Sequence, residues 1–162
     1  MLKSIEQVQT VDKAQSLYEV DYNLWILSTV EALRKKDFSS LDLENLIDEV
    51  LGLSRRDKKK LKSLLKHLIE HFLKLQYWKT ERARNQAHWK SEIENFRQLI
   101  RDELKDSPSL KPFLKEIYLG CYQDARKLVA LRSQLSIDIF PEQPLISFEQ
   151  SLDENCFPES EI

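Results

Sequence analysis

The chain has 162 residues, enough for one domain with a buried core, and it is 41% hydrophobic and 32% charged with a net charge of −2. It contains only two glycines, whereas β-sandwiches and dinucleotide-binding folds use glycine in turns and phosphate loops. The composition therefore favours an all-α protein and argues against those two fold classes.

The N-terminal third of the chain predicts an arm and two helices. Residues 1–15 are polar and aperiodic, which indicates a flexible N-terminal arm. Over residues 16–36 apolar side chains recur every three or four positions, which predicts the first helix. A second, shorter helix is predicted over residues 42–51, with Asp42 as its N-cap and Gly52 as its C-terminal stop.

Three further helices are predicted from the middle of the chain. Residues 54–78 predict the longest helix, which begins with a Ser-x-x-Asp start signal. Residues 88–105 predict the next helix, and the polar segment 80–86 before it is either a break or a continuation of helix. Pro108 disfavours helix at the residue before it, and the last long helix is predicted from residue 109 or 110 to about residue 135.

The end of the chain predicts a strap. Residues 136–162 contain three prolines and an acidic tail. They indicate an extended segment that packs on the bundle, with one helical turn beginning at Ser147, where Gln150 completes a capping box. Four to five main helices joined by short polar breaks predict a helical bundle over residues 16–135.

The spacing of the cysteines and the length of the apolar runs indicate the cellular compartment of the protein. Cys121 and Cys156 lack C-x-x-C spacing, so we expect free thiols in a reducing cytoplasm. Cys121 lies on an apolar stripe, which indicates a core thiol. No stretch approaches the roughly 18 apolar residues of a membrane span, and the first residues lack the apolar run of a signal peptide. We therefore expect a cytoplasmic protein with no membrane partner.

Charge is unevenly distributed. Residues 54–101 hold fourteen Lys/Arg and five Asp/Glu, whereas the residues after Arg132 include seven acidic side chains and no basic one. This asymmetry indicates either an acidic tail lying on basic helices or a surface for nucleic acid or an acidic partner. The acidic overall balance favours the first interpretation.

The segment HLIEH (residues 67–71) has the H-x-x-E-H spelling of a zinc peptidase. On a helical wheel both histidines border the apolar stripe, and Glu70 faces away toward solvent with a lysine four residues to either side. A metal at His67 and His71 needs a third ligand from another helix, such as Glu49. We expect instead that His71 hydrogen-bonds a neighbouring carboxylate, so an interhelical metal site is an alternative and no cofactor is predicted.

A second catalytic alternative involves RNA. Arg82 and His88 match the R-x(4–6)-H pattern of HEPN ribonucleases, which are small helical bundles. Arginine can neutralise a scissile phosphate and histidine can transfer protons near neutral pH. The pattern is short, so a metal-independent ribonuclease or RNA-binding protein using the basic 79–90 region is an alternative.

Several segments resemble a known family when they are taken together and in order. They are LYEVDYNLWI (17–26), DLENLIDEV (42–50), HLIEHFLKLQYW (67–78), DSPSL (106–110), FPEQP (140–144) and LDEN (152–155). The chain from about residue 16 to 158 resembles the family of domain of unknown function 29, which are uncharacterised bacterial all-helical proteins. The resemblance implies a compact cytoplasmic helical protein and no assigned activity.

The resemblance also implies a set of candidate residues. The matching positions are Asp21, Trp25, Asp42, Asn45, Glu49, His71, Lys74 and Tyr77. Asp21, Glu49 and His71 fall on three predicted helices and could converge, either as a hydrogen-bonded knot that fixes helix register or as a ligand or metal site; we favour the knot. The chain departs from the family pattern at residues 144–146 (PLI), where a C-P-Y-like triplet is expected.

The sequence therefore predicts a non-catalytic macromolecule-binding or regulatory protein, whose partner is a protein. The candidate binding residues are Asp21, Trp25, Glu49, His71, Lys74 and Tyr77. Nucleic acid bound through residues 54–101 remains an alternative, and the absence of a strong catalytic motif argues against an enzyme.

Overall fold

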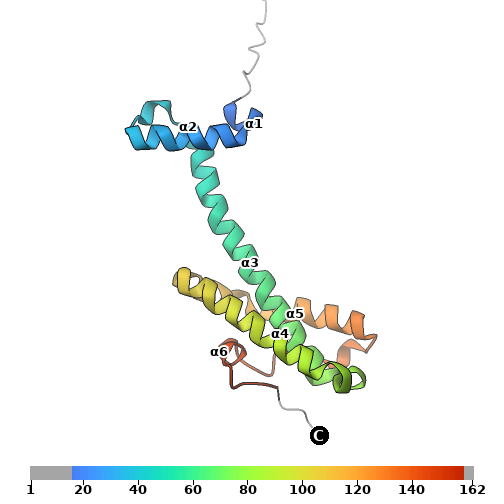
Figure 1. Cartoon of the computed structure of the whole chain (residues 1–162). Helices are drawn as coiled ribbons and strands as arrows, with labels where there is room; N and C mark the ends of the chain where they lie inside the picture. Colours follow the sequence, from blue (N-terminus) through green and yellow to red (C-terminus); the bar gives the residue numbers. More distant parts are fainter. Residues whose placement is uncertain (1–15, 159–162) are drawn as a thin grey trace, which may run out of the picture. The chain divides into compact units, whose positions relative to one another are not determined.

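A computed structural model describes residues 16–158, and every regular element in that range is a helix (Figure 1). The all-α prediction is confirmed. The predicted arm (1–15) and the last residues of the predicted acidic tail (159–162) lie outside the described residues. The chain divides into two compact units, with the boundary between Gly52 and Leu53. We call the part before this boundary unit 1 and the part after it unit 2; the single bundle over residues 16–135 stays a prediction.

Unit 1 is built from short helices and the first turns of a long one. Its elements are α1 (Leu17–Val20), α2 (Tyr22–Lys35), the 3-10 turn η1 (Phe38–Ser40) and the start of α3 (Leu43–Tyr77). The predicted first helix breaks at Asp21, whose carboxylate accepts a hydrogen bond from the Leu24 N–H at 2.9 Å and so caps α2. Lys36 ends α2 in the left-handed conformation, with φ 56°.

The two helices predicted on either side of Gly52 are one helix. α3 runs for 35 residues through Gly52 and Ser54, so the predicted stop and the predicted start signal are both wrong. A glycine stop requires left-handed backbone, and no glycine in the described residues has positive φ. Strong helix formers on both sides outweigh the cost of one interior glycine, about 1 kcal/mol. Asp42 caps the helix as predicted, since its Oδ1 accepts from the Asn45 N–H at 3.3 Å.

Unit 2 contains the rest of α3 and all later elements. These are α4 (Lys79–Asp106), the 3-10 turn η2 (Pro108–Leu110), α5 (Lys111–Ser133), the 3-10 turn η3 (Ile137–Ile139) and α6 (Phe148–Leu152). The polar segment 80–86 is helical, and the break before it lies at Trp78. Pro108 interrupts the helices as predicted, and none of the helices within residues 16–158 is long and apolar enough to cross a bilayer.

α3 is the central helix of the unit 2 core, because its side chains contact both α4 and α5. The His71 ring lies 5.4 Å from the Phe96 ring of α4, whereas the neighbouring Glu70 pairs with Arg132 of α5. Fully buried side chains on the three helices include Leu61, Leu65, Leu68, Ile93, Ile100, Leu114 and Val129. Each such aliphatic side chain stabilises the fold by roughly 2 kcal/mol. Cys121 is buried in this core, as predicted.

The predicted strap is described up to Pro158, and from here on the name covers Gln134 to Pro158. It is held to the long helices of unit 2 through its backbone carbonyls. Four side chains of α5 donate hydrogen bonds to these carbonyls. The Tyr118 hydroxyl donates to the Ile146 carbonyl at 2.9 Å and the Tyr122 hydroxyl to the Pro141 carbonyl at 2.8 Å. Arg126 donates to the Phe140 carbonyl at 2.8 Å, and Gln123 donates to the Glu142 carbonyl. Burial raises the pKa of Tyr118 and raises that of Tyr122 to about 12, so both hydroxyls remain protonated donors at neutral pH. The rings of Phe140 and Phe148 anchor the strap in the core.

Arg97 of α4 fixes the end of the strap and is fully buried. Its guanidinium donates to the Ser151 carbonyl at 2.9 Å, to the Glu94 carboxylate at 2.5 Å and to the Cys156 carbonyl. The Phe72 and Phe157 rings lie 5.1 Å and 5.0 Å from the guanidinium carbon. A buried cation is stable only with such saturation of its donors.

We therefore expect the Arg97→Met substitution to release the end of the strap. It removes every one of these hydrogen bonds and is expected to lower the free energy of unfolding by about 3 kcal/mol. Hydrogen exchange of amides 151–157 should accelerate more than that of α5 amides. Arg101→Met is the matched control, because Arg101 lies one turn away and only approaches Glu154 at 3.8 Å. Equal exchange in the two variants would contradict this role.

Candidate functional site

The predicted residues of unit 1 have structural partners. Tyr18 connects two of them, since its hydroxyl donates to Glu49 Oε1 at 2.8 Å and its ring packs edge-on against Trp25 at 4.9 Å. The bond to Glu49 raises the pKa of Tyr18. Asp21 is occupied as the cap of α2. Glu49 and Trp25 therefore act together through Tyr18 to fix α1 against α2 and α3.

The premise that Asp21, Glu49 and His71 come from three helices is wrong. Glu49 and His71 both lie on α3, because the helix does not end at Gly52. Glu49 belongs to unit 1 and His71 to unit 2. The structure assigns Glu49 to the hydroxyl of Tyr18.

The two histidines of HLIEH pack against one ring of α4. The Phe96 ring stacks on His67 at 5.6 Å and lies 5.4 Å from His71. His71 Nδ1 lies 2.8 Å from the His67 carbonyl oxygen and donates to it, so the expected bond from His71 to a neighbouring carboxylate is replaced by one within α3. Burial lowers the pKa of His71. The ring is therefore neutral at physiological pH, with Nε2 unprotonated.

Glu70 is buried, and the expectation that it faces solvent is wrong. Its side chain is 1% exposed, and Oε2 accepts from Arg132 Nη1 at 2.8 Å. The other oxygen, Oε1, has no hydrogen bond, and His67 Nδ1 lies 3.6 Å from it. The helical wheel fails here because Arg132 of α5 reaches the face of α3 that carries Glu70. Within residues 16–158 no group of three or more His, Cys, Asp or Glu side chains is arranged to hold a metal.

The remaining predicted residues of α3 lie near its C-terminal end. Lys74 is half-buried, and burial lowers its pKa. The Tyr77 ring packs edge-on against Phe140 of the strap at 5.4 Å. His71 and Tyr77 thus lie against α4 and the strap respectively, whereas the charges that act on Lys74 are those of Glu70 and of Arg132 on α5.

Arg82 and His88 occupy different parts of the α4 surface. Arg82 donates through Nη2 to the Gln76 carbonyl at the end of α3, and its Nε is buried without a hydrogen-bond partner. His88 is exposed, and its spacing places it about 120° around the helix from Arg82. The arginine thus caps α3, and the ribonuclease pairing stays a prediction.

Several basic side chains of residues 54–101 are engaged within unit 2. Lys60 pairs with Glu103 at 2.5 Å, Arg97 is buried, and Arg101 faces Glu154 of the strap at 3.8 Å. On α5, Lys115 pairs with Glu149 at 2.7 Å. The structure therefore supports the interpretation of the charge asymmetry as an acidic segment lying on basic helices.

Sequence reasoning missed the exposed apolar side chains of unit 1. In the predicted helix over residues 42–51, Leu43, Leu46, Ile47 and Val50 recur at the spacing of one apolar helical face, which does not by itself distinguish core from surface, and the structure exposes Leu43, Ile47 and Val50. These side chains are 51%, 57% and 57% exposed, and Leu51 beside them is 52% exposed. On α2, Ile26, Val30 and Leu33 are 37–42% exposed at the spacing of one helical face. We call these two sets the apolar stripes of unit 1.

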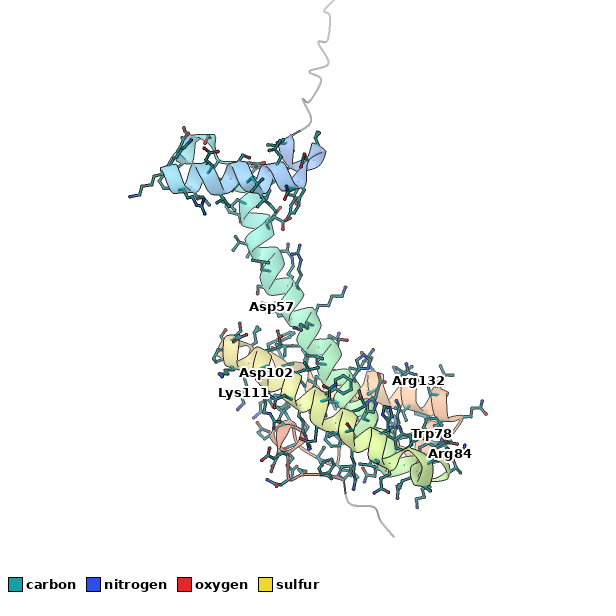
Figure 2. The ribbon with its side chains drawn as sticks, in the orientation of Figure 1. Asp57, Trp78, Arg84, Asp102, Lys111 and Arg132 are labelled. Carbon is teal, nitrogen blue, oxygen red and sulfur yellow. The ribbon has the colours of Figure 1, made fainter. Side chains whose placement is uncertain are left out.

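Little of the described part of unit 1 is buried. Only Trp25 and Thr29 are buried in residues 16–52. The same residues carry eight acidic and three basic side chains. Figure 2 shows side chains projecting around both α2 and the start of α3. Unit 1 therefore combines apolar stripes with negative charge.

The family model for the domain of unknown function DUF29 matches residues 17–157. The chain belongs to the DUF29 family. The resemblance drawn from the six sequence segments is thereby confirmed, and the DUF29 match extends over both units. No curated protein and no solved structure matches the chain.

The pair that the buried Glu70 of this DUF29 protein forms with the half-exposed Arg132 gives a direct test of the unit 2 core. Arg132→Ala leaves the Glu70 carboxylate buried without its hydrogen-bond donor, so the free energy of unfolding should fall by about 3 kcal/mol. Lys127→Ala, an exposed position on the same helix, should change it by less than about 0.5 kcal/mol. Urea denaturation measures both. Adding Glu70→Gln to Arg132→Ala should recover part of the loss, and a purely additive double variant would contradict the pairing.

The buried imidazole predicts a dependence of stability on pH. Because the folded-state pKa of His71 lies below its unfolded value of about 6.5, the unfolded chain binds the proton more tightly. The contribution of His71 is then complete above that pH and is lost as the pH falls below it. The urea midpoint should therefore drop between pH 7.5 and 5.5 by more in the wild type than in His71→Gln. His88→Gln, at an exposed position, should keep the wild-type drop.

Proposed function

We propose that this DUF29 protein is a non-catalytic docking protein, in which unit 1 binds a partner protein through its apolar stripes. The observation that carries the proposal is the exposure of Leu43, Ile47, Val50 and Leu51 on successive turns of α3. Isolated apolar side chains are normal on a protein surface, whereas contiguous apolar patches mark interaction sites.

The negative charge of unit 1 indicates which class of partner protein it would bind. Residues 16–52 are acidic, and the acidic residues Glu44 and Asp48 lie on the same helical turns as the α3 stripe. A partner helix with apolar residues at three- and four-residue spacing and lysine or arginine at its margins complements both features. The docking partner is therefore proposed to be a basic, amphipathic helical segment.

The alternatives rest on fewer observations. The ribonuclease proposal needs Arg82, which caps α3 through the Gln76 carbonyl. The metal proposal needs a ligand beside His67 and His71, whose nearest acidic side chain on α3, Glu70, is paired with Arg132. The two free thiols, Cys121 and Cys156, support the expectation of a reducing cytoplasm, which we retain with the expected bacterial origin.

Paired affinity capture tests the docking proposal. The Ile47→Ser/Val50→Ser variant removes the middle of the α3 stripe, and both positions are so exposed that folding should be unaffected. Proteins crosslinked to the wild type in its own host should include at least one whose recovery falls at least about tenfold with this variant. That protein, purified, should bind the wild type with at least tenfold higher affinity than it binds the variant.

The matched control is Leu131→Ser, which changes an apolar side chain of unit 2 that is 77% exposed. It should retain the same partner as the wild type. Circular dichroism and the urea midpoint should agree across all three proteins. Identical capture by the wild type and the stripe variant would refute docking through unit 1.

A further inference from the structure

Unit 2 contains a cavity whose lining includes one candidate binding residue, Tyr77, and the first two residues of the basic 79–90 region. It has a volume of about 380 Å³ and lies where the end of α3, the start of α4 and the strap meet. Its lining residues are Gln76, Tyr77, Lys79, Thr80, Leu135, Ile139 and Leu145. The volume falls in the range of small-molecule pockets, roughly 300–1,000 Å³. The α3–α4 turn that borders it is the region of Trp78 and Arg84 in Figure 2.

The cavity has an apolar side and a cationic side. The strap supplies Leu135, Ile139 and Leu145, and the last two are 45% and 63% exposed, which leaves an apolar wall in contact with water. The end of α3 and the start of α4 contribute the polar lining residues Gln76, Lys79 and Thr80. No acidic residue lines the cavity, and no ion pair within residues 16–158 engages Lys79.

Two features next to the cavity add to its combination of apolar and cationic residues. Arg82 donates to the backbone carbonyl of Gln76, so a second positive charge is bonded to a residue that lines the cavity. Gln76, Tyr77 and Leu145 also line a second, smaller void of about 20 Å³, whose other lining residues include Phe72, Tyr118 and Ile146. A ligand in the cavity therefore has both a lysine side chain and exposed apolar side chains among its lining residues.

We propose that this cavity binds a small amphipathic anion, a carboxylate with an unbranched aliphatic chain. Lys79 and Thr80 bind the carboxylate by a charge-assisted hydrogen bond and a hydroxyl hydrogen bond. The aliphatic chain lies along Ile139 and Leu145 and displaces water from them. This site is independent of docking through unit 1.

Decanoate is the probe, and isothermal titration together with methyl NMR is the measurement. We expect saturable one-to-one binding to the full chain, with methyl shifts at Leu135, Ile139 and Leu145. Lys79→Gln should weaken binding about tenfold, because a charged hydrogen-bond partner is lost. Leu145→Gln should weaken it as well, and decanol should bind at least tenfold more weakly than decanoate.

Two controls separate this site from other apolar or basic surfaces. Lys127→Gln removes an exposed lysine elsewhere on unit 2, and Ile47→Ser/Val50→Ser alters unit 1; both variants should bind decanoate as the wild type does. Vesicles of phosphatidylglycerol should not retain the protein, which distinguishes a free carboxylate from a lipid surface. The proposal is overturned by absent or non-saturable binding, by retention on vesicles, by Lys79→Gln binding as the wild type, or by loss of binding in either control.

Discussion

The backbone carbonyls of the strap impose the main constraint on unit 2. A segment with little helix and no neighbouring strand within residues 134–158 leaves its C=O groups without regular partners, and burial of such groups is costly unless donors reach them. Tyr118, Tyr122 and Arg126 of α5 and Arg97 of α4 supply those donors. The apolar wall of the cavity exists because these bonds hold the strap in place beside α3.

α3 carries two different kinds of surface along one helix. In unit 2 it lies between α4 and α5, and its buried side chains extend around it from Leu68 to Glu70 and Leu73. In unit 1 its apolar side chains are exposed. The same pattern of leucine, isoleucine and valine therefore stabilises the core in one half and is exposed to solvent in the other.

Local signals predicted the elements that local interactions determine. The capping box at Ser147 forms as predicted, with Ser147 Oγ accepting from the Gln150 N–H at 3.1 Å, and Pro108 breaks the helices where expected. Two of the wrong predictions concern Gly52 and Glu70. The conformation of Gly52 depends on the continuity of a long helix, and the burial of Glu70 depends on a helix more than 60 residues later in the chain. A helical wheel drawn for one helix contains no information about residues of other helices. It therefore cannot predict that Arg132 of α5 pairs with Glu70, or that Arg82 of α4 donates to the Gln76 carbonyl at the end of α3.

Anchoring through carbonyls also affects how the strap can evolve. A C=O group is present whatever side chain follows it, so replacement of Ile146 or Glu142 leaves the acceptor for the α5 donor intact. We therefore expect substitutions to be tolerated better at the exposed positions of the strap than at the donors on α4 and α5 or at the buried Phe140 and Phe148. The departure from the family pattern that the sequence predicts at Pro144-Leu145-Ile146 falls in this segment, where Leu145 lines the cavity and the Ile146 carbonyl accepts from Tyr118 whichever side chain it carries.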